Sequence, residues 1–259
     1  MRTVPAILTT AALLAGSACS SDEDAPTPAP SAGAVTSSPT PSSLPFDRAA
    51  AEIAAKAGLL TLADFPSGWT AAPTEDDDDG DEFAEAMQDC LGTDSAFFTD
   101  DPADSVSQDS LEFSSPDEAL TISNSVIVAR EDRLTEFFDV LAVDKLPVCL
   151  ARVIDEVVAP QVLAEQDPGG TQITFSPARV TRISFPTLGD QTVPLRAKLT
   201  AAAEGLAFDV FLDLVFIRTG NAATSVTFEA AGLAMPSDIA ERYARLAAER
   251  IGVTSAQLA

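Results

Sequence analysis

The sequence contains no histidine, one tryptophan, one tyrosine and three cysteines among its 259 residues. Histidine is the commonest general base, so its absence excludes a Ser-His-Asp or Cys-His catalytic centre. Basic residues are also scarce, because 15 Lys and Arg stand against 40 Asp and Glu, a formal net charge of −25. Since nucleic acids bind through basic surfaces, we expect no nucleic-acid partner. No pattern indicates a cofactor.

No apolar run reaches the roughly 20 residues that a membrane-spanning helix needs. The run from Val4 to Leu14 is too short, and the run from Phe208 to Ile217 is short and interrupted by acids. A basic start at Arg2, this first apolar run and the small residues after it predict a secretory signal peptide over residues 1–18.

The residues before Cys19 resemble a bacterial lipobox, with Gly16 at the position where Leu is usual. The resemblance implies that signal cleavage occurs before Cys19 and that this residue is lipidated. The lipid would then hold the protein at the outer face of the cytoplasmic membrane, in the cell envelope, because several acyl chains anchor a protein stably. The alternative is a secreted protein in which Cys19 has no role.

The odd number of cysteines favours lipidation, because an unpaired cysteine outside the cytoplasm needs an explanation. Cys90 and Cys149 can pair, which leaves Cys19 for a thioether. A Cys90–Cys149 disulfide would close a loop of about 60 residues and contribute roughly 4 kcal/mol. The alternative is two buried free thiols. There is no Cys-x-x-Cys motif, so we interpret the pair as structural.

Residues 19–45 are rich in Pro, Ser and Thr and predict an extended tether without a core. Residues 46–259 are long enough for one domain. Within it, the acidic run from Glu75 to Glu82 fails the EF-hand pattern, because Ala86 stands where a bidentate Glu is needed. We therefore interpret this run as a solvated loop and expect no metal site.

Apolar spacing and breaker residues predict helices in five places. The expected segments are 46–58, 83–91, 134–141, 147 to the residue before Pro160, and 237 to Gly252. Alternating apolar residues predict strands near 111–113, 120–128, 173–185, 195–199, 208–217 and 226–228. Strands and helices in separate runs predict an α+β fold, a twisted antiparallel sheet of about six or seven strands with helices mainly on one face.

Several motifs resemble the PknH-like extracellular sensor domain family, which occurs on mycobacterial-type receptor kinases and related lipoproteins. They are Phe185-Pro-Thr-Leu-Gly-Asp190, Phe216-Ile-Arg-Thr-Gly-Asn221 and the last helix through Arg250, within residues 105–253. The Phe65-Pro-Ser-Gly-Trp69 turn is similar to a recurring feature of envelope lipoproteins of the same bacterial group. The resemblance implies ligand sensing or binding outside the membrane. Kinase sensors of this type have two disulfides, whereas here one can form in the domain.

A ligand would lie in a cleft between the sheet and the helices. The candidate binding residues are Trp69, Arg179, Arg182, Arg196 and Arg218, the arginines for an anionic group. Each also has an ordinary explanation, because Trp69 can anchor the core and the arginines can be surface cations.

Three functions remain open from the sequence. The first is a lipid-anchored, non-catalytic binding or sensor-like domain for a small molecule, a lipid or an envelope protein. The second is an envelope interaction protein that holds a partner through its acidic surface. The third is a carboxylate-based cell-wall hydrolase, which needs two carboxylates about 5 to 9.5 Å apart. We favour the first, and therefore do not expect an enzyme.

Overall fold

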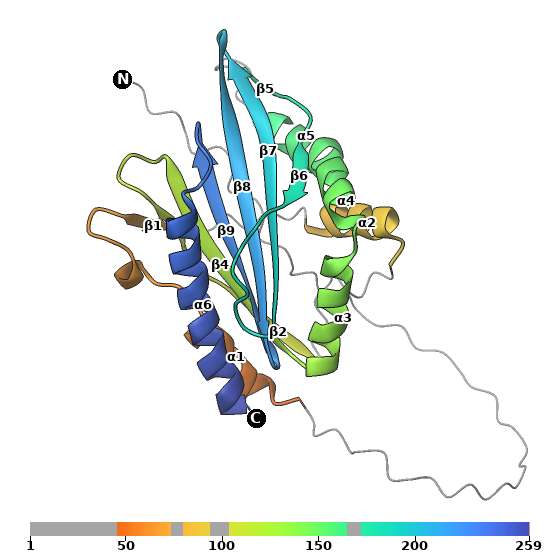
Figure 1. Cartoon of the computed structure of the whole chain (residues 1–259), viewed down its shortest axis with the longest axis vertical. Coiled ribbons are helices and arrows are strands. Elements are labelled where there is room, and N and C mark those ends of the chain that lie inside the picture. Colours follow the sequence, from red (N-terminus) through yellow and green to blue (C-terminus); the bar gives the residue numbers. More distant parts are fainter. Residues whose placement is uncertain (1–45, 74–79, 94–103, 165–171, 259) are drawn as a thin grey trace, which may run out of the picture.

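The computed structural model describes residues 46–73, 80–93, 104–164 and 172–258 (Figure 1). They form an α+β fold in which one open antiparallel sheet is combined with helices. The fold class predicted from the sequence is therefore confirmed.

The sheet has nine strands in the described residues. They are β1 (Thr70–Ala72), β2 (Ser105–Asp109), β3 (Glu112–Ser114), β4 (Leu120–Ala129), β5 (Ile173–Phe175), β6 (Arg179–Arg182), β7 (Gln191–Ala203), β8 (Leu206–Thr219) and β9 (Ala222–Ala231). Their order is β1-β3-β4-β9-β8-β7-β5, with β2 also paired to β4 and β6 also paired to β7. The count exceeds the expected six or seven because strands of three residues, such as β1, are too short to show alternation in the sequence.

Helices occur near all five predicted segments. They are α1 (Arg48–Ala57), the short η1 (Leu62–Asp64), α2 (Gly80–Leu91), α3 (Glu131–Ala142), α4 (Leu146–Val153), the π-helical turn η3 (Ile154–Val158), α5 (Ala159–Ala164) and α6 (Ser237–Leu258). The first helix starts at an Asp47 side chain that accepts a hydrogen bond from the Ala50 N–H at 3.0 Å. It ends at Gly58, as predicted.

The expectation that helices lie mainly on one face of the sheet is wrong. Helices α1 and α6 pack with Val226 and Phe228 of β9 in one core. Helices α2, α3 and α4 pack in a second core that includes Ala223 of the same strand. Since residues of opposite parity on a strand point to opposite faces, the two cores lie on the two sides of the sheet. The reason is that β8 has apolar residues on both faces. Leu214 and Val215 point to opposite sides of the sheet, and both are buried.

Two helices continue past the residues at which they were expected to stop. The helix that begins at α4 passes Pro160 and reaches Ala164, because the preceding turn widens to the π-helical η3 and relieves the steric conflict of proline. The last helix passes Gly252, because Ile251 before the glycine and Thr254 after it are both buried against the rest of the fold. The packing outweighs the penalty of about 1 kcal/mol for glycine in a helix.

Polar side chains tie the first described segment to the sheet and to the last helix. The Leu60 N–H donates a hydrogen bond of 2.8 Å to Oδ1 of Asn124, a buried residue of β4. Arg250 of α6 donates to the Leu59 carbonyl oxygen and forms an ion pair with Asp64 at 2.6 Å. Helices α1 and α6 therefore lie side by side, although they stand at opposite ends of the chain (Figure 1).

Candidate functional site

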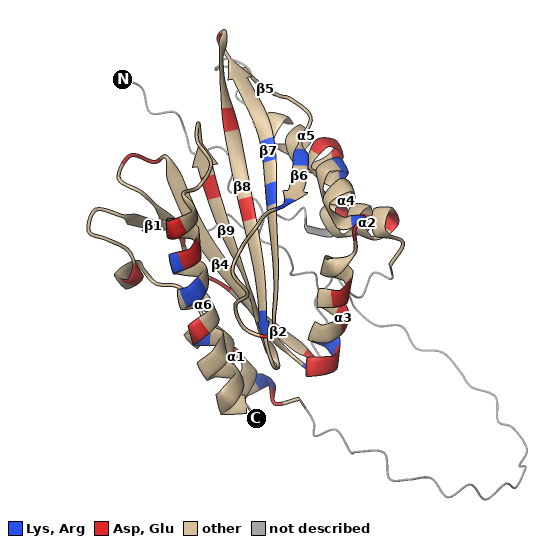
Figure 2. Ribbon diagram, viewed as in Figure 1, with Lys and Arg blue, Asp and Glu red and all other residues tan. Residues whose placement is uncertain are grey.

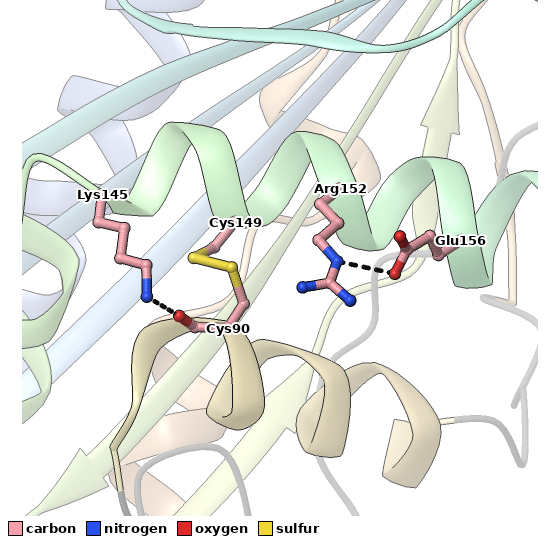
Figure 3. Close-up of a disulfide and its surroundings, with 5 residues drawn as sticks. All are labelled: Cys90, Lys145, Cys149, Arg152 and Glu156. Carbon is pink, nitrogen blue, oxygen red and sulfur yellow. Dashed lines mark hydrogen bonds and ion pairs between the residues drawn. A yellow bond between two sulfur atoms is a disulfide. The ribbon is translucent and has the colours of Figure 1, made fainter.

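A disulfide between Cys90 and Cys149 joins helix α2 to helix α4 (Figure 3). The two Cα atoms are 5.5 Å apart, which is usual for a disulfide, and the Cys149 side chain is fully buried. The Lys145 ammonium donates a hydrogen bond to the Cys90 carbonyl oxygen beside it. The pairing predicted from the cysteine count is confirmed.

Trp69 belongs to an aromatic cluster on the α6 side of the sheet. The centroid of its ring lies 4.9 Å from that of Phe65 and 6.3 Å from that of Tyr243. Phe65 also stacks on Phe113, with 4.4 Å between the ring centroids. The half-buried indole therefore contributes to the core, and its role in ligand binding stays a prediction.

The four candidate arginines are divided between the two faces of the sheet. Arg182 and Arg218 lie on the face covered by α3. Arg182 donates to the carbonyl oxygens of Leu141 and Val143, at 2.8 and 3.0 Å, at the end of that helix. Arg218 donates from Nη1 to Thr135 Oγ1 at 2.9 Å. Both guanidinium groups thus hold α3 against the sheet.

Arg179 and Arg196 lie on the opposite face, on neighbouring strands. Arg196 forms a two-pronged ion pair with Asp213, with N–O distances of 2.5 and 2.6 Å. Asp213 is only 1 % exposed, and its hydrogen bonds raise the pKa of Arg196. The guanidinium also lies 5.8 Å from the centre of the Phe211 ring. The fold thus does not bring the four arginines together, and their roles in ligand binding stay predictions.

A set of polar side chains that sequence reasoning missed lines part of the α3 side of the sheet. Strands β3, β4 and β9 lie side by side, and Phe113, Ile122 and Phe228 point from them into the core beneath α6. Residues of the other parity therefore point to the opposite side. We call these residues the hydroxyl face: Glu112, Ser114, Thr121, Ser123, Ser225, Thr227 and Glu229.

The strand registers place these residues in rows across the sheet. Thr121 of β4 lies opposite Glu229 of β9, and Ser123 lies opposite Thr227. On its other side, Thr227 lies opposite Leu214 of β8, which belongs to the core beneath the helices. The hydroxyl face is therefore the polar continuation of an apolar surface that the helices cover.

The hydroxyl of Thr227 makes no hydrogen bond within the described part of the chain, and it is not among the buried polar atoms that lack a partner, so it is open to solvent. Thr227 is 9 % exposed, whereas Thr224 on the same strand is 2 % exposed. Thr224, which points to the other face, donates to the Ser125 carbonyl oxygen at 2.8 Å and accepts from Asn124 Nδ2 at 3.2 Å. Buried hydroxyls usually have such partners, whereas the hydroxyl of Thr227 is available to water or to a ligand.

Two carboxyl groups belong to the hydroxyl face. Burial and, to a smaller extent, the negative charge of Glu112 together raise the pKa of Glu229 to about 8. Glu112 is itself only 7 % exposed. Near neutral pH, Glu229 is therefore largely protonated and can donate or accept a hydrogen bond.

No Lys or Arg belongs to strands β3, β4 or β9 (Figure 2). The nearest basic residue of β8 on this side is Arg218, at the end of the strand that α3 covers. The hydroxyl face thus combines hydroxyls and acids without a basic partner on its own strands. This composition suits a polar ligand that is not an anion.

The sequence carries a weak signal of this face, which is the alternation of Thr121 and Ser123 with apolar residues. An ordinary solvent-facing strand gives the same pattern. Only the pairing of β4 with β9 shows that a second polar row lies beside the first. The two acids come from strands that are separated by more than a hundred residues in the chain.

Some predictions concern residues outside the described part of the chain. These are the signal peptide, Cys19, the tether over residues 19–45, and most of the acidic run that starts at Glu75. Among the described residues, no helix is long and apolar enough to cross a membrane. Within the same residues, no three Cys, Asp or Glu side chains are grouped so that they could hold a metal ion.

No family model and no curated protein sequence matches this chain. Among solved structures, the chain is similar to the extracellular domain of PknH from Mycobacterium tuberculosis, with a TM-score of 0.40 and 13% identity over 83% of this chain and 98% of that one. It is also similar to LpqN of the same organism, described as involved in cell envelope biogenesis, with a TM-score of 0.23 and 14% identity over 72% and 75% of the two chains.

A likeness at such TM-scores assigns neither a ligand nor a functional residue to this chain. The function proposed below therefore rests on the geometry of the hydroxyl face and on the disulfide.

Proposed function

We propose that this protein is a non-catalytic binding domain of the cell envelope that holds a small polar ligand on its hydroxyl face. The observation that carries the proposal is the double row of polar side chains on β4 and β9, in which the Thr227 hydroxyl makes no hydrogen bond to another described residue. This hydroxyl is not among the buried polar atoms that lack a partner, so it is open to solvent. A polar ligand on this face would hydrogen-bond to it.

The proposed location is the outer face of the cytoplasmic membrane. The Cys90–Cys149 disulfide supports it, because structural disulfides persist mainly in oxidising compartments. Cleavage of the signal peptide and lipidation of Cys19 belong to the same proposal. The strong negative charge keeps the domain soluble beside an anionic membrane while the tether holds it there.

The test compares two threonine variants of one strand, using the full chain purified gently from its own membranes. Native mass spectrometry is expected to show an additional mass on the wild type. Thr227→Val keeps the shape of the side chain and should remove this mass while leaving the free energy of unfolding equal or higher. Thr224→Val is the matched control, because it breaks the hydrogen bonds on the other face and should destabilise the protein but retain the mass.

Two outcomes would contradict the proposal. One is a wild type that carries no additional mass in repeated preparations, and the other is a Thr227→Val variant that retains the mass in full. The same spectra give the mass of the mature chain. A mass without acyl chains would refute the lipid anchor at Cys19 but would leave the ligand-binding proposal untouched.

Glu112 and Glu229 also favour a second candidate, the carboxylate-based hydrolase. Such enzymes use one protonated and one ionised carboxyl group. The raised pKa of Glu229 would make it the protonated group and Glu112 the ionised one. Release of reducing sugar from purified cell-wall glycan distinguishes the candidates, since a binding domain leaves the glycan intact. Turnover that Glu229→Gln abolishes would establish the enzyme.

A further inference from the structure

Buried polar atoms without a partner gather at one end of the sheet. In the described part of the chain, four buried side-chain nitrogen or oxygen atoms make no hydrogen bond. Three of them are Gln191 Oε1, Arg218 Nε and Asn221 Oδ1, and the fourth is Thr93 Oγ1. Because most buried polar atoms of folded proteins are hydrogen-bonded, three exceptions at one place indicate a site that a ligand completes.

The strand registers bring the first three side chains to the same end of the sheet. Gln191 of β7 lies directly opposite Arg218 of β8, so both side chains point to one face, with Cβ atoms about 5 Å apart. Asn221 follows in the turn between β8 and β9. Its carbonyl oxygen accepts a hydrogen bond from the N–H of Ala129, at the end of the strand that leads into α3. The three side chains therefore lie beside the start of α3 (Figure 1).

Arg218 carries a positive charge that no described acid neutralises. Its side chain is half-buried, and Nη1 donates to Thr135 Oγ1, which is uncharged. Arg196 of the neighbouring strand, by contrast, forms an ion pair with Asp213. Acids outnumber bases by 40 to 15 in this chain, and charges that leave water usually have a charged partner. An anion from outside the chain would supply the partner that Arg218 lacks.

The free edge of the Arg218 guanidinium consists of Nε and Nη2. Nη2 makes no hydrogen bond to a described residue and is not among the buried atoms without a partner, so this atom is open to solvent. The two parallel N–H groups of such an edge match the two oxygens of a carboxylate. Gln191 and Asn221 end in amides, which donate as well as accept, so either can turn an N–H toward the same anion.

We infer that Arg218, Gln191 and Asn221 bind the carboxylate group of a small molecule. The site lies apart from the hydroxyl face, and it does not depend on the ligand proposed there. A carboxylate brings one negative charge, which Arg218 balances. A phosphate dianion brings more charge than Arg218 balances, and the net charge of −25 repels it more strongly.

The acids near the site leave the Arg218 edge available. Asp190 Oδ2 accepts a hydrogen bond from the Gly220 N–H at 2.8 Å. In the first turn of α3, Asp132 forms an ion pair with Arg130. Glu131 of the same turn is exposed, so solvent and salt screen its charge. These negative charges still weaken the binding of an anion, so the probe is used at millimolar concentration.

The test titrates the full chain with acetate and with acetamide, which has nearly the same shape but no charge. Proton–nitrogen NMR spectra at constant ionic strength follow the side-chain N–H groups. Acetate should shift the resonances of Arg218 Nε–H and of the Gln191 and Asn221 amides, and the shifts should saturate together. Acetamide should bind at least about tenfold more weakly.

Two variants locate the binding, and a third is the control. Arg218→Lys keeps the charge but removes the two-pronged edge, so it should weaken acetate binding at least about tenfold. Gln191→Leu removes a buried amide without a partner, so it should weaken binding about threefold with no loss of unfolding free energy. Arg182→Lys is the matched control, because Arg182 also holds α3, through the Leu141 and Val143 carbonyl oxygens, and it should bind acetate like the wild type.

Several results would overturn the inference. They are equal binding of acetate and acetamide, undiminished acetate binding in Arg218→Lys, and equal weakening in Arg218→Lys and Arg182→Lys, which would reveal a general loosening of α3. Tighter binding of inorganic phosphate than of acetate would overturn the carboxylate assignment. The mass lost in Thr227→Val tests the hydroxyl face separately, so either idea can fail alone.

Discussion

At the scale of single residues, Glu229 makes the stability of the protein depend on pH. An unfolded glutamate has a pKa near 4.5, whereas burial raises that of Glu229 to about 8 in the folded state. Between these values the folded state holds a proton that the unfolded state releases. The stability contributed by the protonated group is complete below the lower pKa and is lost as the pH rises to the higher one, by about 1.4 kcal/mol per pH unit.

We therefore predict that Glu229→Gln flattens this decline. Urea unfolding at pH 5, 6, 7 and 8 should show a variant whose free energy of unfolding exceeds that of the wild type by more at each higher pH. The exposed Glu249→Gln serves as the control, with a difference from wild type that stays constant. A constant difference for Glu229→Gln as well would show that the side chain does not hold its proton in the folded state.

Thr224 and Thr227 are the same residue type on the same strand, but their hydroxyls differ in hydrogen bonding. The Thr224 hydroxyl hydrogen-bonds to Asn124, Ser125 and Ser225, whereas the Thr227 hydroxyl has no partner among the described residues. The sequence presents both as ordinary threonines of a strand. Both lie between β4 and β8, and their difference arises from the face of the sheet to which each side chain points.

At the scale of elements, two short motifs meet at one end of the sheet. The Asp190 N–H donates to the Arg218 carbonyl oxygen at 2.7 Å, and the Gly220 N–H donates to Asp190 Oδ2 at 2.8 Å. The start of β7 is thereby connected to the turn between β8 and β9. Both segments belong to motifs quoted from the sequence, and the structure shows that they form one unit.

Gly189 is expected to be essential to this unit. Its φ is 64°, and a Cβ atom there would collide with the Arg218 carbonyl oxygen and the Thr219 hydroxyl. Gly189→Ala should therefore lower the free energy of unfolding by about 2–4 kcal/mol, as measured by urea denaturation.

Gly205 provides the comparison for that prediction. Its φ is 81°, but a Cβ atom there would meet nothing within 4 Å. Gly205→Ala carries only the backbone strain and should lower stability by about 1 kcal/mol. Equal effects of the two variants would mean that the close approach at Gly189 is unimportant.

At the scale of the whole molecule, the disulfide links two helices that are distant in the chain. Cys90 and Cys149 are separated by 59 residues, so their bond restricts the unfolded chain strongly. The double variant Cys90→Ala/Cys149→Ala should lose about 4 kcal/mol of unfolding free energy by the chain-entropy model, measured by chemical denaturation.

Reductant supplies the control for the disulfide. Under denaturing conditions it should lower the unfolding midpoint of the wild type toward that of the double variant, and it should leave the variant unchanged. A loss below about 1 kcal/mol in the variant would show that the bond adds little to the stability of the fold.

The sequence by itself determined the α+β class, the cysteine pair and most of the turns. These features depend on local signals, such as strand alternation, helical spacing and glycine or proline at turns, and on a simple count of cysteines. It did not show that helices would cover both faces of the sheet.

Only the tertiary structure decided where helices end, how the arginines are distributed and where polar residues gather. Helix α6 passes Gly252 because packing of Ile251 outweighs local propensity. Arg182 and Arg196 point to opposite faces because of their registers on β6 and β7. The hydroxyl face exists because β4 lies between β3 and β9, and pairing between distant strands leaves no local trace in the chain.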